Sequence, residues 1–540
     1  MKLFAIVVFL FLSLSVFSQF ENILISTVNN PEEPSIYINT KNPALIMAGA
    51  NIHSQYLSQD SGRTWARSVL TSDSSGVWGD PCIVSDTAGD FYFIHLSNPP
   101  TGSWIDRIAC QKYDVSLGMW TYDSYMGLNP IKAEDKEGNP INTDDLSTRP
   151  RGYKAQDKAW LVVDPATNNL YVTWTEFDRY GSANPEHESR IMFSRSLDGG
   201  ATWSQAKQIN NVNGDCIDSD NTVEGAVPAV GPNGEIYVAW AGPLGLVFDR
   251  SLDTGNTWLA NDIFVNTIPG GWDFDVSGIY RANGLPITVC DLSGGPNSGD
   301  IYINWSDQRN GNTDVWLVKS TDGGNNWTSP LKVNDDTTQT HQFFTWMSID
   351  QVTGYLYFVF YDRRAYGGDT TDVFLAITRD GGQTFENHRI SKSPFVPNHN
   401  IFFGDYTNIS AQNGMVRPIW TRLNNDSLSV WTALINLDSI NTFIDYPSNP
   451  NAEAEADVYP NPTTSQIAFS YKIKAKTFVS LEVIDNLGKK IAVLIDGEER
   501  RPGMYIEHFD IRNSQLSTGV YYFVLSQEGK KNLVKKFIVN

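Results

Sequence analysis

The sequence has little positive charge for its length. Its 540 residues include 40 lysines and arginines against 61 aspartates and glutamates, which gives a formal net charge of −21. Nucleic-acid binding needs a basic surface that neutralises phosphates, so we expect no nucleic-acid partner. Histidine is also scarce, with seven residues and no His-Glu-x-x-His motif. The sequence therefore predicts no catalytic zinc site and no required cofactor.

Long apolar runs are missing after the first residues of the chain. Lys2 is followed by an apolar segment that ends at Phe17, and then by Ser18 and Gln19. A basic start, an apolar middle and a small residue at the cut are typical of a signal peptide. The run is shorter than the roughly 20 residues that a membrane helix needs. We predict that residues 1–19 are cleaved and that the exported chain has no stable membrane span.

Cysteine is rare, and the four residues allow three pairings into two bridges: Cys82, Cys110, Cys216 and Cys290. The repeat described below places Cys82 and Cys110 on the first and third strands of one sheet. Such strands lie roughly 9–10 Å apart, beyond the ~7 Å Cα separation that a disulfide spans. We predict no bridge between these two residues.

Glycine, proline and tryptophan, in contrast, are plentiful, with 42, 26 and 16 residues. An eight-residue pattern, Ser-x-Asp-x-Gly-x-Thr-Trp, recurs with few substitutions at residues 58–65, 196–203, 251–258, 320–327 and 378–385, and a degenerate copy lies at 114–120. In a hairpin turn, the carboxylate accepts hydrogen bonds from turn amides, glycine adopts a positive φ, and the indole ring packs between strands. We interpret the five repeated aspartates as structural rather than catalytic: Asp60, Asp198, Asp253, Asp322 and Asp380.

A second repeat consists of short runs rich in β-forming residues that usually end in an aromatic residue. They occupy Leu45–Ala48, Phe91–Ile94, Leu170–Trp174, Ile236–Trp240, Ile301–Trp305, Leu356–Phe360 and Val416–Trp420. Such periods are typical of a β-propeller. The sequence predicts an all-β fold: a seven-bladed β-propeller with four-stranded antiparallel blades over residues 20–440, with six blades as the alternative. Residues 22–27 could supply the outer strand of the last blade, whereas Pro418 weakens that blade because proline cannot donate to a ladder.

The chain changes character near its C-terminus. Residues 441–456 are rich in Pro, Asn, Ala and Glu and are predicted to form a linker. From Asp457 onward basic residues outnumber acidic ones, which marks a second domain over residues 457–540. Five candidate strands favour a small β-sandwich: 466–471, 478–485, 505–511, 519–527 and 533–539.

Two family resemblances follow from these motifs. The repeated turn resembles the Asp-box, or bacterial neuraminidase repeat, of sialidase-like β-propellers, over most of residues 35–390. The tail resembles the type A C-terminal sorting domain of type IX secretion substrates in Bacteroidetes-type bacteria, through Val458-Tyr-Pro-Asn-Pro462, residues 483–488, residues 516–522 and the closing Lys535-Lys-Phe-Ile-Val-Asn540. This second resemblance implies export to the periplasm, passage across the outer membrane by the type IX machinery, and a secreted or cell-surface location.

Polar residues recur at the channel-side ends of the expected blades. The positions before inner strands hold Asp80, Asp157 with Lys158, Glu224, Asp273 with Asp275, His341, and Asp405 with Tyr406, and those after second strands hold Glu176, Asp178, Arg179, Asp307, Arg309, Asp362, Arg363 and Arg364. Because these ends open on one face of a propeller, we expect a site there. The Asp-x-Arg pairs could instead form ion pairs between blades, and we favour that structural interpretation.

The Asp-box resemblance implies a sharper alternative, an exo-α-sialidase-type glycoside hydrolase. In that family three arginines hold the substrate carboxylate, a tyrosine assisted by a glutamate is the nucleophile, and an aspartate is the acid/base. The resemblance implies Arg179, Arg309 and Arg363 or Arg364 as the clasp, Tyr406 or Tyr361 as nucleophile, Glu224 as helper and Asp80 as acid. Where the first arginine of that family belongs, however, the sequence reads Glu33-Pro-Ser-Ile36.

The leading functional hypothesis is a propeller that binds extracellular or cell-surface glycans without assured catalysis. Aromatic rings would stack on sugars and carboxylates would bind hydroxyl groups. The candidate ligand-binding residues are Asp157, Glu176, Asp307, Asp362, Asp405, Trp78 and Trp272, with Phe344 and Trp346 as further rings. One acidic loop could also hold a structural Ca²⁺ through Asp215, Asp218, Asp220 and Glu224, although its spacing is not that of an EF-hand and a solvated loop is the favoured alternative.

Overall fold

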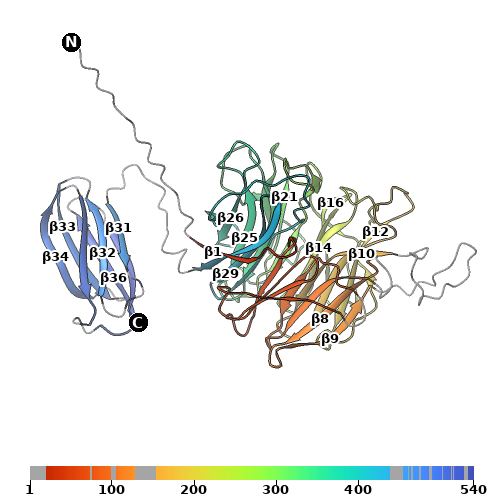
Figure 1. Ribbon diagram of the computed structural model, residues 1–540, viewed down its shortest axis with the longest axis horizontal. Coiled ribbons are helices and arrows are strands. Elements are labelled where there is room, and N and C mark those ends of the chain that lie inside the picture. The colour runs from red at the N-terminus through yellow and green to blue at the C-terminus, as the bar shows by residue number, and fades with distance from the viewer. Residues whose placement is uncertain are drawn as a thin grey trace, which may run out of the picture. The chain divides into compact units, whose positions relative to one another are not determined.

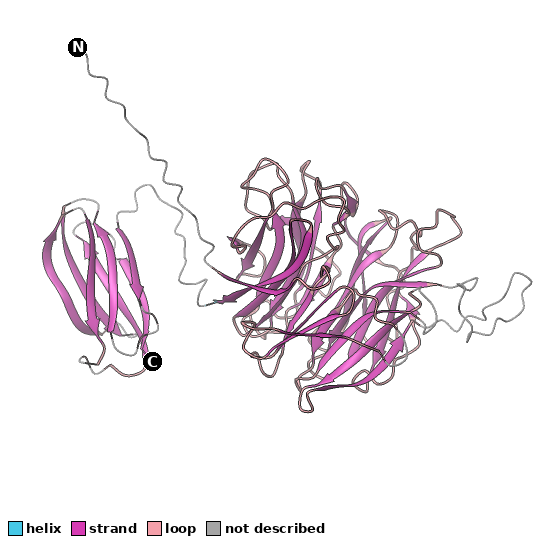
Figure 2. Ribbon diagram, in the orientation of Figure 1, coloured by secondary structure: helices cyan, strands magenta, loops and turns pink. Residues whose placement is uncertain are grey.

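The computed structural model describes residues 20–72, 76–98, 105–127 and 154–437, and most of residues 454–539. The chain forms two compact units, Met1–Asn441 and Thr442–Asn540. All the elements assigned in the described ranges are strands, which confirms the all-β class (Figures 1 and 2). The predicted signal peptide and most of the predicted linker lie outside the described residues.

The described residues of the first unit form seven four-stranded antiparallel sheets. The first sheet consists of β2 (Ser35–Ile38), β3 (Ile46–Ala50), β4 (Ser54–Ser58) and β5 (Ala66–Val69). The second consists of β6 (Cys82–Ser85), β7 (Phe91–Ser97), β8 (Arg107–Asp114) and β9 (Met119–Met126). The third consists of β10 (Ala155–Val163), β11 (Leu170–Phe177), β12 (Ser189–Ser196) and β13 (Lys207–Gln208). The fourth sheet consists of β14 (Glu224–Val230), β15 (Ile236–Gly242), β16 (Gly245–Ser251) and β17 (Ile263–Asn266). The fifth consists of β20 (Ile287–Cys290), β21 (Ile301–Asp307), β22 (Asp314–Ser320) and β23 (Leu331–Lys332). The sixth consists of β24 (Gln342–Asp350), β25 (Tyr355–Asp362), β26 (Asp372–Thr378) and β27 (Glu386–Arg389).

The first strands of these sheets form a closed ring. Each contacts the first strand of the next sheet, in the order β2, β6, β10, β14, β20 and β24, then β28 (Asn408–Gln412), which contacts β2. The sheets are therefore the four-stranded blades of a β-propeller around a central channel. Six of the seven second-strand runs read from the sequence lie within the second strands of these sheets, and the first overlaps β3 except for Leu45. A short hairpin of β18 (Asp273–Phe274) and β19 (Ala282–Asn283) follows β17 and precedes β20 in the chain.

The last sheet joins the two ends of the first unit. Its order is β1 (Glu21–Ser26), β30 (Ser427–Asn436), β29 (Met415–Asn424) and β28, so the N-terminal strand supplies the outer edge as the sequence predicts. Pro418 is tolerated in β29 because neither it nor Arg417 has a paired residue in β30, although the register is the same on both sides. Arg417 Nη1 donates to the carbonyl oxygen of Ile435 at 2.7 Å, and Nε donates to that of Ser61 in the first sheet at 2.9 Å.

The five repeated turns lie between the third and fourth strands of their sheets and share one hydrogen-bond pattern. In the copy that follows β22, Ser320 Oγ accepts from Gly324 N at 2.8 Å and donates to Asp322, which accepts from Asn326 N at 2.9 Å. Hydrogen bonds from Asn326 lower the pKa of Asp322 to about 2. The indole rings pack against the preceding blade, as for Trp327 on Phe248 with ring centroids 5.1 Å apart. The aspartates are structural turn residues.

The second unit consists of two sheets around one apolar core. One contains β31 (Ala454–Tyr459), β32 (Gln466–Ile473) and β35 (Gly503–Asp510), and the other contains β34 (Lys490–Arg500), β33 (Thr477–Asp485), β36 (Gly519–Gln527) and β37 (Leu533–Val539). Phe469 of the first sheet stacks on Phe523 of the second at 5.1 Å. The sequence predicts five of these strands and misses β31, which begins inside the expected linker, and the largely exposed β34.

Two further predictions, on a bridge between Cys82 and Cys110 and on a membrane span, can be compared with this fold. Cys82 and Cys110 lie on β6 and β8, and all four cysteines are free and buried, which agrees with the predicted absence of a bridge. In the part of the chain that the structure describes, no helix is long and apolar enough to span a bilayer.

Candidate functional site

Charged residues from five blades converge where the inner strands begin. Glu33 precedes β2, Asp80 precedes β6, Lys158 lies in β10, and Asp405 precedes β28. Lys158 Nζ lies 2.7 Å from Asp405 Oδ2, 3.7 Å from Asp80 Oδ2 and 3.8 Å from Glu33 Oε1. The four side chains are buried. We use the name channel cluster for Glu33, Asp80, Asp157, Lys158, Glu224, Arg281 and Asp405.

Arg281 reaches this cluster from the segment of residues 267–286, which we call the cap hairpin because it contains β18 and β19. Its Nε donates to Asp405 Oδ1 at 2.9 Å, its Nη2 also bonds Asp405, and its Nη1 donates to Asp218 Oδ2 at 3.0 Å. Asn283 of the same hairpin donates to the carbonyl oxygen of Asp405 at 2.9 Å. The cap hairpin therefore ties the last blade to the loop before β14.

The backbone at the cluster is strained. Glu33, Asp80 and Lys158 have φ values of 50°, 49° and 50°. Residues other than glycine rarely adopt this left-handed conformation, which costs on the order of 1–3 kcal/mol each and concentrates at functional sites. In β10 and β14 the ladder also shifts register, between Asp157 and Trp160 and between Glu224 and Val227. These bulges re-aim side chains at the entry of the inner strands.

The acids of the channel cluster fall into two classes by their pKa values, because burial and neighbouring charges act on them differently. Burial disfavours the Asp405 carboxylate, but Lys158 and Arg281 outweigh it and lower its pKa to about 2. Burial followed by repulsion from Asp80 raises the pKa of Asp157 to about 7. Burial is also the main cause that raises the pKa values of Glu33 and Glu224 well above the ordinary range. Near neutral pH the cluster therefore contains an ionised Asp405 beside acids that hold protons.

A pocket lies directly beside these charges. It has about 390 Å³ of empty space, including solvent at its mouth, and its lining includes Lys158, Asn283 and Asp405 together with Gly225, Leu285, Phe344 and the three rings of Trp160, Trp346 and Tyr406. The centroids of Trp160 and Trp346 are 4.5 Å apart, and those of Trp160 and Tyr406 are 5.1 Å apart. An aromatic wall with a few converging polar groups is the usual composition of a small-ligand site.

Three buried oxygens of this region lack a hydrogen-bond partner among the residues that the structure describes. They are Asp80 Oδ2, Glu224 Oε1 and the Tyr406 hydroxyl. A buried polar group without a partner costs about 1–3 kcal/mol. Burial and the nearby acids raise the pKa of Tyr406 well above its usual value, which opposes its predicted role as a nucleophile.

The arginine clasp implied by the sialidase resemblance does not form from the residues that the sequence suggests. Arg309 Nε binds Asp307 Oδ1 at 2.9 Å, and its guanidinium lies 4.5 Å from the ring centroid of Trp316. Arg309 Nη2 also reaches Asn266 of the preceding blade at 3.3 Å. Asp307 is fully buried, so this pair is a structural contact between blades rather than a free cation.

The other expected clasp residues are also placed elsewhere. Arg364 binds Asp362 at 2.7 Å and contacts Asp335 beyond β23 of the preceding blade. Arg363 is 2% exposed and lies 3.1 Å from Thr371 Oγ1. Arg179 is exposed on the loop after β11. The Asp-x-Arg pairs therefore match the structural alternative.

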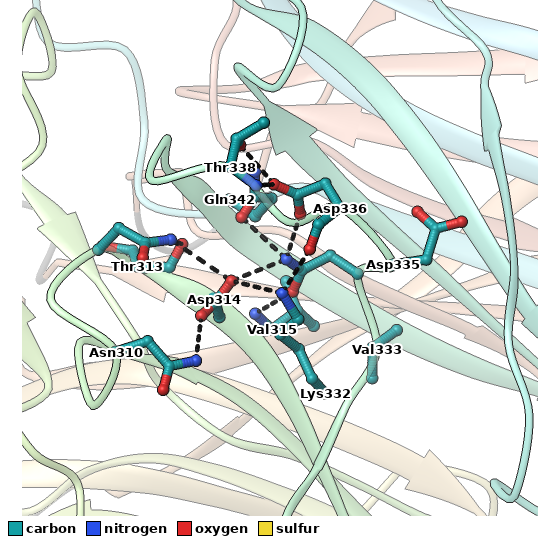
Figure 3. A network of polar contacts seen from close by, with 12 residues as sticks. Asn310, Thr313, Asp314, Val315, Lys332, Val333, Asp335, Asp336, Thr338 and Gln342 are labelled. Atoms are coloured by element: carbon teal, nitrogen blue, oxygen red, sulfur yellow. Dashed lines mark hydrogen bonds and ion pairs between the residues drawn. The ribbon is translucent and has the colours of Figure 1, made fainter.

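A polar network surrounds Asp314 and Asp336 near this blade boundary (Figure 3). At its centre Asn334 Nδ2 donates to Asp314 Oδ1 at 2.8 Å and to Asp336 Oδ1 at 2.7 Å. The side-chain nitrogen of Gln342 in β24 donates to the same Asp314 Oδ1 at 3.3 Å. Asn334 Oδ1 accepts from Val315 N, so the network links β22, β24 and the chain after β23. Asp335 and Asp336 sit in that chain and face Arg364 of the next blade.

Of the remaining predicted ligand-binding residues, some are paired or packed inside the fold and one is exposed to solvent. Glu176 forms an ion pair with Lys154 at 2.7 Å, and Asp362 is occupied by Arg364. Trp272 is 4% exposed and donates from Nε1 to the carbonyl oxygen of Thr222, so it is a packing residue. Trp78 is 39% exposed and available to solvent.

The acidic residues suggested as Ca²⁺ ligands accept hydrogen bonds from different donors. Asp215 accepts from Thr222 Oγ1 at 2.9 Å, Asp218 from Tyr180 at 2.6 Å and from Arg281, and Asp220 from Asp273 N at 2.9 Å. Within the described ranges, no three acidic, histidine or cysteine side chains are arranged to hold a metal ion. A calcium site formed by Asp215, Asp218, Asp220 and Glu224 stays a prediction.

Comparison with known proteins agrees with the domain assignment of the tail. Residues 457–540 match the family "Secretion system C-terminal sorting domain". The chain thus carries the sorting domain of type IX secretion and is secreted or located at the cell surface. No curated protein is similar to the chain in sequence.

Several solved structures resemble the chain in three dimensions. The NanB sialidase from Streptococcus pneumoniae has a TM-score of 0.42 and 10% identity, over 73% of this chain and 83% of that one. The intramolecular trans-sialidase from Ruminococcus gnavus has a TM-score of 0.41 and 11% identity, over 66% and 94%. The sialidase from Trypanosoma rangeli has a TM-score of 0.37 and 13% identity, over 87% and 84%. Likeness at this level carries no statement about activity.

Sequence reasoning places Asp80, Asp157, Lys158, Glu224, Asp405 and Tyr406 at this site but misses other members. Arg281 and Asn283 lie in the cap hairpin, which belongs to no repeat. Glu33 precedes the first inner strand as Asp80 precedes the second, and this position is the signal that could have identified it. Trp160 follows Asp157 on β10 and could have been found from the same strand.

Proposed function

We propose that this secreted propeller binds a glycan in the pocket beside the channel cluster. The observation that carries the proposal is the aromatic wall of Trp160, Trp346 and Tyr406 next to Lys158, Asn283 and Asp405. Aromatic faces stack on the C–H surfaces of sugars, and carboxylates and amides pair with hydroxyl groups. The type IX sorting domain delivers the chain to a space where extracellular and cell-surface glycans occur.

The charge of the pocket favours a sugar without a carboxylate. The channel cluster contains five acids and two cations, and both cations already contact acids. Sialic acid would place its carboxylate beside the ionised Asp405, which already binds both Lys158 and Arg281. A neutral or basic sugar meets no such repulsion.

The experiment is a glycan array with the purified secreted chain and the variant Trp346→Ala. We expect the chain to bind one class of glycan and the variant to lose most of that binding, because the ring forms part of the pocket wall. Phe264→Ala is the matched control, since Phe264 is exposed on β17, the fourth strand of its sheet. An array without any binder, or a Trp346→Ala variant that binds as the wild type does, would reject the proposal.

A glycoside hydrolase that uses the same pocket is the second candidate, and the contrast of pKa values within the cluster favours it. Asp405 is ionised, while burial and Asp80 raise the pKa of Asp157 to about 7. Two carboxyl groups with separated pKa values can act as base and acid. Incubation of the bound glycan with the chain tests this candidate, and product release that Asp157→Asn abolishes would support it. Turnover of sialosides would instead support the sialidase alternative.

A further inference from the structure

An exposed aromatic ring stands next to Arg281 on the cap hairpin. Tyr280 is 62% exposed, although Ile279 before it is buried and Arg281 after it binds Asp405. The ring of Tyr280 meets that of Phe402 edge to face, with centroids 6.0 Å apart. Such a contact covers at most one face of a ring, so the other face of Tyr280 is open to solvent.

Arg281 lies beside the same rings and is itself within reach of solvent. Its guanidinium lies 5.5 Å from the ring centroid of Phe402, and its side chain is 32% exposed. Three of its five N–H groups donate to Asp405 and Asp218, and the other two have no partner among the residues that the structure describes. Tyr180, which is 43% exposed, donates to the same Asp218 oxygen at 2.6 Å. We use the name rim for Tyr180, Tyr280, Arg281 and Phe402.

The rim is continuous with the pocket. Arg281 Nε donates at 2.9 Å to Asp405, which lines the pocket, and Asn283 of the same hairpin lines it too. Three peptide units separate Tyr280 from Asn283, so their Cα atoms lie within ~11 Å of each other. The hairpin is fixed in place, because Ile279 is buried and Asn283 donates to the carbonyl oxygen of Asp405. A fixed platform of this kind can bind a second part of the same ligand at little cost in entropy.

An open aromatic face beside unused N–H donors suits a sugar. The C–H face of a pyranose stacks on an aromatic ring, and its hydroxyl oxygens accept hydrogen bonds from a guanidinium. A purely apolar group would cover the ring but would leave the N–H donors of Arg281 without partners. An anionic group suits the rim less well, because Asp405 and Asp218 already balance the charge of Arg281.

We propose that the ligand is an oligosaccharide rather than a single sugar, with one unit in the pocket and the following units along the rim. One of these units stacks on Tyr280, and its hydroxyl oxygens accept hydrogen bonds from Arg281. This inference rests on the proposed glycan-binding function and adds a second subsite to it. Tyr280 is then a residue that selects for the length of the glycan.

The test is a calorimetric titration of the secreted chain with oligosaccharides of one to four units of glucose, galactose, mannose or N-acetylglucosamine. If the array identifies another glycan, the length series of that glycan is used. We expect the affinity to rise about threefold to tenfold once the oligosaccharide is long enough to reach Tyr280, which is the gain that stacking on one aromatic ring provides. Tyr280→Ala should remove this gain, so that every member of the series binds like the shortest one.

Two control variants separate the ring from other effects. Tyr280→Phe keeps the ring and should keep the gain, and Phe264→Ala, which removes an exposed ring from β17, should bind the whole series as the wild type does. Equal affinities along the series, a gain that Tyr280→Ala retains, or a gain that Tyr280→Phe loses would overturn the rim subsite while glycan binding stands. Failure of every oligosaccharide and of every array glycan would overturn the proposed function itself.

Discussion

Lys158 Nζ lies 2.7 Å from Asp405 Oδ2 across the propeller channel, although 247 residues separate the two in the sequence. Lys158 comes from the entry of β10 and Asp405 from the segment before β28, so the contact joins two blades that are not neighbours in the ring. Arg281 of the cap hairpin reaches Asp405 as well. One aspartate therefore holds two cations from separate parts of the fold at the proposed ligand pocket.

The first prediction concerns this contact. Lys158→Met should destabilise the chain by about 3–5 kcal/mol, because it leaves Asp405, Asp80 and Glu33 buried with one cation fewer. Urea unfolding followed by tryptophan fluorescence measures the change. Lys41→Met, at an exposed position, should alter stability little. A Lys158→Met protein as stable as the wild type would mean that the ion pairs do not form.

The second prediction concerns pH. Burial is the main cause that raises the pKa of Asp157 to about 7 and that of Glu32 to about 8, and it also raises those of Glu33 and Glu224. The folded state therefore holds protons that the unfolded state releases near pH 4, so this contribution to stability is full at low pH and is lost as the pH rises through 7 and 8. We expect the unfolding temperature to fall by a few degrees between pH 6.5 and 8.5.

The prediction is restricted to pH 6.5–8.5 because, at lower pH, the buried His95 makes the stability rise with pH instead of fall. Burial lowers its pKa to about 4, so its effect on stability is complete above the ordinary histidine pKa of about 6.5. Scanning calorimetry in buffers of constant ionic strength measures the dependence, and Asp157→Asn should make it shallower. Stability that rises over this range would contradict the account of the buried acids.

The third prediction concerns the repeated turns. Ser320→Ala removes the acceptor for Gly324 N and the donor to Asp322, and Ser320 is buried. The loss should cost about 1–3 kcal/mol, because an amide is left unpaired. Ser298→Ala, at an exposed position between β20 and β21, is the matched control in the same urea titration. Equal stability of the two variants would count against the turn chemistry.

The fourth prediction separates blade packing from ligand binding. Arg309→Lys should lower stability by roughly 1–2 kcal/mol, since lysine replaces neither the paired hydrogen bonds to Asp307 nor the stacking on Trp316. Its affinity for the array-identified glycan should equal that of the wild type. If Arg309→Lys keeps the stability of the wild type but loses glycan binding, Arg309 belongs to the substrate clasp that the sialidase resemblance implies.

The fold is predictable from the sequence to the extent that local chemistry determines it. The Asp322 turn needs only residues within one octapeptide, and the β-rich runs repeat often enough to predict four-stranded blades. The entry of each inner strand is also set by the repeat, which is why Asp80, Asp157, Glu224 and Asp405 could be assigned to one face before the structure was known.

The remaining parts of the site depend on competition between side chains, which spacing does not reveal. Arg309 and Arg364 lie at channel-side loops as expected, but the aspartate two residues earlier, the last residue of the preceding strand, binds each guanidinium. Arg281 reaches the cluster only because the cap hairpin folds back over Asp405 and Asp218, a long-range packing event without a repeat or motif. The pocket rings of Trp160 and Trp346 likewise meet only when β10 and β24 face each other across the channel.

The most direct test of the central claim is a binding measurement on the pocket itself. Calorimetric titration of the array-identified glycan should give an affinity at least about tenfold lower for Asn283→Ala and for Trp346→Ala than for the wild type, with unfolding temperatures showing that both variants are folded. If both folded variants bind the glycan with wild-type affinity, the ligand does not occupy the channel pocket and the account is wrong.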